Sequence, residues 1–139
     1  MKKKIFLAFF MLLPLVANAK YYNDIYQAQK EALKEAKLML FIIVSHRCKY
    51  CHKLLDDIAN NPQLIQLLDE KFVVTITDLE EPTARIPSNV GFRGKTPSTI
   101  ILTPTGKIIG KQIEGAISSH DLYVLLNSFE EYKQTQLGF

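Results

Sequence analysis

The sequence predicts an α/β fold in which one central mixed sheet is flanked by helices in a single domain. The strongest observation is residues 38–44 (LMLFIIV), an apolar run without a polar member, which is typical of a strand covered on both faces. Segments with apolar residues at helical spacing stand on both sides of this run. Farther along, the turn sequence 104–107 (PTGK) separates two isoleucine-rich segments, which predicts an antiparallel hairpin in the same sheet.

The first half of the chain is expected to alternate helix and strand. Apolar residues recur at helical spacing over residues 21–37, so we expect an amphipathic helix before the 38–44 strand. A second amphipathic stretch opens at the cysteines and ends near Asn60, and Asn61 and Pro62 then offer an N-cap and a first-turn proline for a new helix. The positions expected on the apolar face of the first helix are Tyr22, Ile25, Tyr26, Leu33 and Ala36.

The second half is predicted as strand, connection, hairpin and helix. Residues 72–77 form the second strand, and residues 98–103 and 108–113 are the two strands of the hairpin. Residues 78–92 are polar and hold two prolines, so we expect a long connection, and the sequence assigns no chemistry to it. Ser118 can cap the last helix, whose apolar positions are Leu122, Leu125, Leu126 and Phe129.

The beginning of the sequence is typical of a secretory signal peptide. Three lysines follow Met1, residues 5–16 are apolar, and residues 17–19 (ANA) give the small-residue pattern of a cleavage site. We therefore expect residues 1–19 to be a signal peptide cleaved after Ala19, and residues 20–139 to be one domain exported to the periplasm. An uncleaved membrane anchor is the alternative, although the apolar run is shorter than the ~20 residues of a spanning helix.

The charge of the expected mature chain is balanced. Three of the seventeen lysine and arginine residues precede Ala19, which leaves fourteen against fourteen aspartate and glutamate residues. A neutral domain without a basic block gives no electrostatic case for a nucleic acid partner. Residues 20–139 are enough for one hydrophobic core and too few for two domains.

The chemistry of the sequence is concentrated in residues 48–52 (CKYCH), directly after the apolar run. Cys48 and Cys51 are the only two cysteines, and residues three apart at a helix start lie within one turn of each other. Their sulfurs can therefore form and break a disulfide with little movement of the backbone. Cys51 continues an apolar helical stripe, so we expect it to be buried and Cys48 to be the more exposed sulfur. An inert structural crosslink is the alternative, although so small a loop gains little stability.

Cys48 is the expected attacking sulfur. The helix N-terminus and the positive charges of Arg47, Lys49 and Lys53 favour its thiolate. His46, Lys49 and Tyr50 are the residues expected to tune the redox pair. Cys51 is expected to attack the mixed disulfide formed on Cys48 and to release the reduced partner. No cofactor beyond this redox-active disulfide is expected.

Two other chemistries use the same residues. Cys-x-x-Cys-His is also the sequence of a c-type haem attachment site, with His52 as an axial ligand, and an exported electron-transfer protein would suit it. The strand, hairpin and helix that follow have no explanation in that case. A zinc ion on His46, Cys48, Cys51 and His52 would have suitable ligand types, but ligands so close in sequence distort a tetrahedron, and no metal site is predicted.

The order of elements and motifs resembles the thioredoxin family over nearly the whole of residues 20–139. The resemblance is carried by the strand leading into Cys-x-x-Cys, by residues 91–97 (GFRGKTP) before the hairpin, and by Gly115 and Ala116 before the serine-capped helix. Residues 48–54 (CKYCHKL) are most similar to the catalytic domains of periplasmic Dsb-type disulfide isomerases and to small exported thioredoxin-like reductases.

The resemblance implies a thioredoxin fold and a protein thiol–disulfide oxidoreductase, with the reductase or isomerase direction favoured. It implies a cis Thr96–Pro97 bond beside the disulfide, and Thr96, Pro97 and Gly115 as residues that bind an extended substrate segment. Ile42 stands where thioredoxin has a buried acid behind the second cysteine.

The partners that the resemblance implies are periplasmic thiol or disulfide proteins and a membrane-embedded electron donor. The dimerisation region of the larger isomerases is missing, so a monomer is expected. A redox-inactive thioredoxin-like binding module is the remaining alternative.

Overall fold

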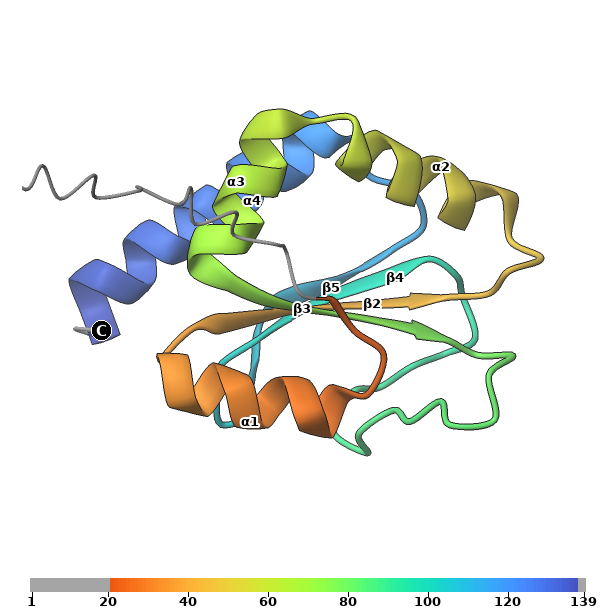
Figure 1. Cartoon of the computed structure of the whole chain (residues 1–139), viewed down its shortest axis with the longest axis horizontal. Coiled ribbons are helices and arrows are strands. Elements are labelled where there is room, and N and C mark those ends of the chain that lie inside the picture. Colours follow the sequence, from red (N-terminus) through yellow and green to blue (C-terminus); the bar gives the residue numbers. More distant parts are fainter. Residues whose placement is uncertain (1–20, 138–139) are drawn as a thin grey trace, which may run out of the picture.

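A computed structural model describes residues 21–137 of the chain, so the expected signal peptide and Lys20 lie outside the described residues. The chain forms a five-stranded sheet in the order β1-β3-β2-β4-β5, with helices on both faces (Figure 1). β1, β2 and β3 are parallel, while β4 runs antiparallel to β2 and β5 antiparallel to β4, which confirms the predicted mixed sheet. No helix within residues 21–137 is both long enough and apolar enough to cross a membrane. In chain order the elements are β1 (Tyr21–Tyr22), α1 (Ile25–Glu35), β2 (Leu38–Val44), α2 (Lys49–Ala59), α3 (Pro62–Lys71), β3 (Phe72–Asp78), β4 (Ser98–Leu102), β5 (Ile108–Glu114), α4 (Ser119–Tyr132) and a π-helical turn (Lys133–Leu137).

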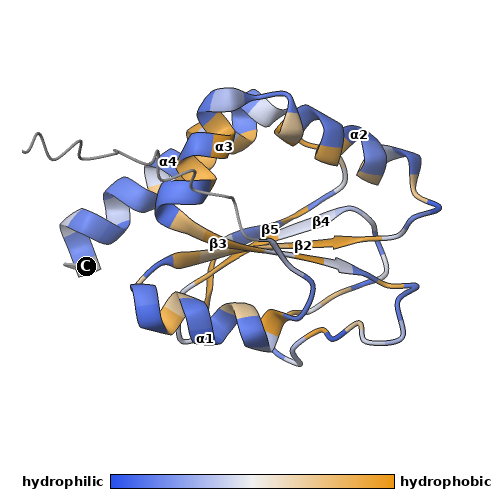
Figure 2. Cartoon of the chain, in the orientation of Figure 1, coloured by the Kyte–Doolittle hydropathy of each residue, from blue (hydrophilic) through white to orange (hydrophobic). Residues whose placement is uncertain are grey.

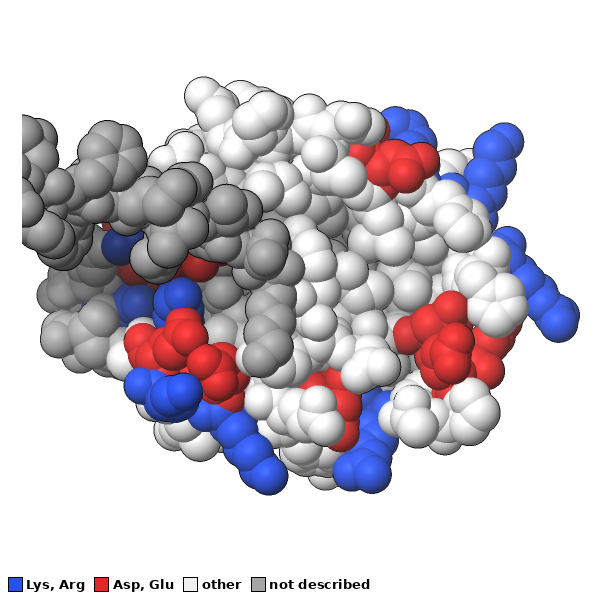
Figure 3. Space-filling model, in the orientation of Figure 1, with Lys and Arg blue, Asp and Glu red and all other residues white. Residues whose placement is uncertain are grey.

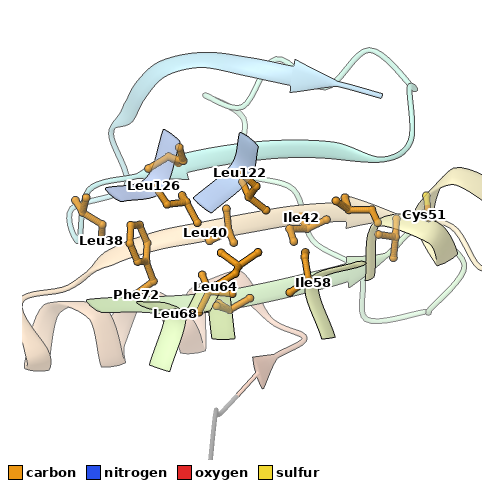
Figure 4. Close-up of a cluster of buried hydrophobic side chains, with 14 residues drawn as sticks. Leu38, Leu40, Ile42, Cys51, Ile58, Leu64, Leu68, Phe72, Leu122 and Leu126 are labelled. Carbon is orange, nitrogen blue, oxygen red and sulfur yellow. The ribbon is translucent and has the colours of Figure 1, made fainter. Parts of the chain in front are cut away.

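Strand β2 is the centre of the core, and all seven of its residues are buried. Because successive side chains of a strand point to opposite faces, β2 contributes to two hydrophobic clusters. Met39, Phe41 and Ile43 pack toward α1, and the alternate residues pack under α2, α3 and α4 (Figure 4). Figure 2 shows the hydrophobic residues gathered on β2 and on the helix faces turned toward the sheet. The alternate β2 residues are Leu38, Leu40, Ile42 and Val44.

Helix α1 begins later than predicted and buries other residues. Tyr21–Tyr22 pairs with β3 as an edge strand, and the Asp24 side chain then caps α1 by accepting a hydrogen bond from the backbone N–H of Tyr26. The expected apolar face was wrong in part, because Tyr26 and Leu33 are 44% and 54% exposed. Alanines instead let the helix approach the sheet closely, and the buried positions are Ile25, Ala28 and Ala32.

The later helices begin at the capping residues that the sequence indicated. The Asn61 side chain accepts a hydrogen bond of 3.1 Å from the backbone N–H of Leu64 and caps α3, with Pro62 in its first turn. Ser118 Oγ accepts one of 3.1 Å from the N–H of Asp121 and caps α4. These caps supply oxygen acceptors for helix N–H groups that have no partner within the helix.

Candidate active site

Three loops meet at one edge of the sheet. β2 and β3 are parallel, so their carboxyl ends lie side by side, and Val44 pairs with Asp78 at that edge. β4 is antiparallel to β2, so its amino end lies there too, with Ser98 opposite Ile43. The segments after β2, after β3 and before β4 therefore come together at the right of Figure 1, beside the start of α2. Residues far apart in the sequence can act on one sulfur pair at this edge.

The two cysteines form a disulfide at the start of α2. Their Cα atoms are 5.2 Å apart, within the range that a disulfide needs. Cys51 is 2% exposed and packs in the hydrophobic cluster between α2 and the sheet (Figure 4). Cys48 is half-buried at the edge. This is the order of exposure expected from the apolar stripe of the helix. An incoming group reaches Cys48 before it reaches Cys51.

The surroundings of Cys48 favour a negative charge on its sulfur. Cys48 is the N-cap of α2, and its Sγ accepts a hydrogen bond of 3.2 Å from the backbone N–H of Cys51. Arg47 is 87% exposed and Lys49 is exposed on the first helical turn. Figure 3 shows basic side chains at this end of the molecule, beside an acidic group. The helix dipole and the N–H donor stabilise a thiolate more than a thiol. Arg47 and Lys49 add positive charge at this end of the molecule, and Arg47 also pairs with Glu80 at 3.6 Å.

His46 lies between two carboxylates. Its Nδ1 is 3.0 Å from Oδ2 of Asp78, and its Nε2 contacts Oε2 of Glu80. The hydroxyl of Ser45 donates a second bond, of 2.8 Å, to Glu80. Each ring nitrogen thus faces one carboxylate, and His46 lies two residues before Cys48. We had no sequence signal for Asp78 and Glu80, because the 78–92 connection is polar throughout.

The acids of this cluster hold the loop before Cys48 to the end of β3. The pKa of Asp78 lies below its ordinary value, first because its carboxylate accepts a hydrogen bond from the backbone N–H of Glu80, and also because of His46. His52 adds a second tie, since its Nε2–H donates to the carbonyl oxygen of His46 at 2.8 Å. The histidines therefore position the loop, while Tyr50, 62% exposed, offers an aromatic surface beside Cys48.

The cluster of His46, Asp78 and Glu80 is also the group of described residues that could hold a cation. One ligand atom from each lies within 4.8 Å of the others. This set differs from the four zinc ligands that the sequence suggested, and the two sets have only His46 in common. The His46 ring contacts both carboxylates directly.

The residues expected to bind substrate lie against the disulfide. The Thr96–Pro97 peptide bond is cis, and the carbonyl oxygen of Thr96 is 3.5 Å from Cys48 Sγ. The backbone N–H of Gly115 donates to the carbonyl oxygen of Pro97 at 2.8 Å. Thr96, Pro97 and Gly115 thus form one rim next to the more exposed sulfur.

A carboxylate that the sequence did not indicate holds the loop before Pro97. Glu114, at the end of β5, accepts bonds from Arg93 at 2.9 Å and from Lys95 at 3.4 Å. Arg93 first, and Lys95 after it, hold the pKa of Glu114 below its usual range. Glu114 lies close to Arg93 and Lys95 because it pairs with Ser98 across the hairpin. That pairing depends on the strand register, which the sequence alone does not give.

Comparisons with known proteins agree with this geometry. The family model for the thioredoxin-like domain matches residues 25–130. No curated protein matches the sequence.

Solved structures share the fold at low identity, so they bear on the fold alone. A thioredoxin from Thermus thermophilus is 20% identical with a TM-score of 0.65, over 86% of this chain and 92% of that one. A disulphide isomerase from Xylella fastidiosa Temecula1 is 16% identical with a TM-score of 0.60, over 75% and 86%. A thioredoxin-fold protein from Helicobacter pylori is 18% identical with a TM-score of 0.62, over 73% and 74%. The family match, the sheet order and the disulfide-bonded Cys-x-x-Cys pair show that this chain belongs to the thioredoxin-like family.

Proposed function

We propose that this protein is an exported thiol–disulfide oxidoreductase that reduces or isomerises disulfides of periplasmic proteins. The observation that carries the proposal is the difference between its two sulfurs, because Cys48 caps a helix at an accessible edge and Cys51 is 2% exposed behind it. Export is supported by the signal-peptide pattern of residues 1–19.

The reaction proceeds in two exchange steps. The Cys48 thiolate attacks one sulfur of a substrate disulfide, forms a mixed disulfide, and the second substrate sulfur leaves as a thiolate. The Cys51 thiolate, formed by loss of its proton to solvent, then attacks Cys48 Sγ. The Cys48–Cys51 disulfide forms, the first substrate sulfur leaves, and two electrons have passed to the substrate. A membrane-embedded donor of the exporting cell restores the dithiol.

The rim at Thr96 is proposed to hold the substrate. An extended segment can pair with its backbone as a short added strand, which brings a substrate disulfide to Cys48. The exposed ring of Tyr50 and the cations Arg47 and Lys49 border the same edge. These groups suit an unfolded or flexible protein segment better than a small rigid ligand.

Reduction of insulin by dithiothreitol tests the activity, with turbidity as the readout. Wild-type protein is expected to accelerate it, and Cys48→Ala to abolish the acceleration. A Cys51→Ala variant should accumulate mixed disulfides with exported proteins, which identify the substrates, and Cys48→Ala should trap none. If wild-type protein does not accelerate reduction and Cys51→Ala traps no partner, the result would instead support a redox-inactive binding module.

No observation on residues 21–137 favours haem attachment. That chemistry needs both sulfurs as thioethers and His52 as a ligand. The thioredoxin-like family match supports the thiol–disulfide proposal instead, because haem attachment does not explain the strand, hairpin and helix that follow the cysteines. A Soret band on the exported protein would overturn this choice.

A further inference from the structure

We propose that the hydroxyl of Thr99 is the polar group that serves Cys51, donating a hydrogen bond to its thiolate while the mixed disulfide is resolved. The inference rests on the proposed function and adds a residue to it. Neither its position in the sequence nor a motif indicated Thr99, and the argument depends on strand register and burial.

Thr99 lies on the face of the sheet that carries Cys51. It pairs directly with Ile42 across β2 and β4, and directly opposite residues hold their Cβ atoms about 4.5–5.5 Å apart on one face. Ile42 packs in the same hydrophobic cluster as Cys51, under α2, as Figure 4 shows. Ile101, two residues beyond Thr99, belongs to this cluster too, which confirms the face. Ile42 thus pairs with Thr99 in the adjacent strand and shares one hydrophobic cluster with Cys51.

The Thr99 hydroxyl is buried and has no hydrogen-bond partner among the described residues. Thr99 is 1% exposed, so water does not reach the hydroxyl from the surface. A buried hydroxyl without a partner costs free energy, and native structures contain few of them. In the disulfide-bonded state shown here, this cost is unrelieved. Once Cys51 carries a charge, its sulfur is a much better acceptor and the hydroxyl gains a partner.

The other buried polar side chains do not meet this description. Ser98 donates to the Lys95 carbonyl, and Glu130 pairs with Lys133, which also bonds the Ala36 carbonyl at the far end of β2. Thr75 and Thr77 follow Val73 on the α1 face of the sheet, away from Cys51. Within residues 21–137 the buried polar or charged side chains are Thr75, Thr77, Ser98, Thr99, Glu130 and Lys133.

A hydroxyl acts at the resolution step and not at the first attack. Thr99 does not itself take the Cys51 proton, which goes to solvent. Its O–H stabilises the anion that remains, and this anion is the nucleophile that displaces the substrate from Cys48. The half-buried Cys48 has the helix N-terminus for the same purpose, so its attack does not depend on Thr99.

Rapid mixing of the reduced protein with excess 5,5′-dithiobis(2-nitrobenzoate) separates the two steps. Attack by Cys48 releases one coloured thiolate at a rate proportional to reagent concentration, and ring closure by Cys51 releases the second at a rate independent of it. Thr99→Val keeps the shape and removes the hydroxyl. We expect it to slow the second phase about tenfold, the effect of one hydrogen bond to a charged group, and to leave the first unchanged.

Two variants make the comparison specific. Thr99→Ser restores the hydroxyl and should recover most of the second-phase rate. Thr75→Val removes the other unpartnered buried threonine hydroxyl, on the opposite face, and should leave both phases unchanged. The disulfide form of Thr99→Val should melt no lower than wild type, because it loses only an unpaired polar group. Its equilibrium with glutathione should shift toward the disulfide.

Each result decides the assignment. A second phase within twofold of wild type in folded Thr99→Val refutes it, and so does a serine variant as slow as valine, which would indicate a packing effect. Equal slowing in Thr75→Val also refutes it. A wild-type protein that releases only one thiolate refutes the proposed function, and the Thr99 role with it.

Discussion

Cys48 and Cys51 are chemically alike, and their surroundings make them different. Reduced protein treated with iodoacetamide at neutral pH should be alkylated at Cys48 about tenfold faster or more, because Cys48 is half-buried at a helix N-terminus and Cys51 is 2% exposed. Peptide mass spectrometry over a time course measures the two rates. The same protein in denaturant is the control, where the two rates should converge. Equal rates in the folded protein would contradict the assignment of Cys48 as the attacking sulfur.

Asp78 gives the site a pH dependence of stability. The pKa of Asp78 is lowered in the folded protein, chiefly by the N–H of Glu80, so the folded state binds fewer protons than the unfolded state. This contribution is present above the unfolded pKa, near 4, and is lost as pH falls through the folded one. Asp78→Asn removes it, so the free energy of unfolding should fall less steeply below about pH 5 than in wild type.

Urea unfolding at neutral pH and near pH 3 measures this difference. Glu81→Gln, in the same exposed turn, is the control and should follow wild type. Identical acid sensitivity in Asp78→Asn and wild type would mean that the carboxylate does not secure the loop.

At the scale of elements, local patterns predicted strands and caps, and long-range pairing supplied the rest. Residues 38–44 were identified because a run buried on both faces has no polar member, and Asn61 and Ser118 because capping is local. The two-residue strand β1 was missed, since it is too short to show a period. Asp78 and Glu114 were missed because their partners depend on β3 and β5 being in register with their neighbours. Asp78 could have been found by assuming that β2 and β3 pair in parallel, because that pairing places Asp78 beside Val44, just before the cysteine loop.

The β5 strand contains a kink that only glycine fits well. Between the pairs Thr99–Ile113 and Ile101–Ile109, β5 spans four residues where β4 spans two. Gly110 takes a φ of +68° there, and a Cβ on it would lie 2.7 Å from Cζ of Phe129 on α4. Gly110→Ala should therefore lower the free energy of unfolding by about 1–3 kcal/mol, from left-handed backbone strain and displacement of the ring.

Chemical denaturation of the oxidised protein measures the Gly110→Ala effect. Gly91→Ala is the matched control, since nothing lies within 4 Å of its Cβ position and its φ is not positive. It should change stability by less than about 0.5 kcal/mol. If the two variants were equally stable, the close packing of β5 on α4 would not constrain this position.

At the scale of the whole molecule, the fold places the more exposed sulfur at one edge of the sheet and brings three separate segments of the chain beside it. The carboxyl ends of β2 and β3 and the amino end of β4 converge there, so His46, Asp78 and Thr96 surround a pair that lies within four residues of sequence. The opposite end of the sheet carries the buried Glu130–Lys133 pair and none of the site. Substitutions at the disulfide edge can thus alter the redox site without altering the residues of the hydrophobic core.

The direction of electron flow in the cell is the prediction that depends on the whole molecule and its surroundings. The helix N-terminus, Arg47 and Lys49 stabilise the Cys48 thiolate and hence the reduced form, which moves the potential to the oxidising side of thioredoxin's roughly −270 mV. An oxidising potential alone would suit an oxidase. The proposed reducing role instead requires a donor, because the periplasm is kept oxidising and a dithiol does not persist there unaided.

We therefore expect Cys48 and Cys51 to be mostly reduced in exporting cells and to become oxidised when the membrane donor is removed. Acid quenching followed by alkylation with a mass-tagged maleimide reads both states from one gel, and Cys48→Ala, which cannot form the pair, marks the position of a single thiol. The pair has Cys51 buried and Cys48 accessible, so the donor and the substrates must meet the same edge, and excess reducible substrate should shift the pair toward the disulfide. A pair that is wholly disulfide-bonded with or without the donor would exclude the reducing role, and an oxidase that passes its disulfide to exported thiols would then be the better assignment.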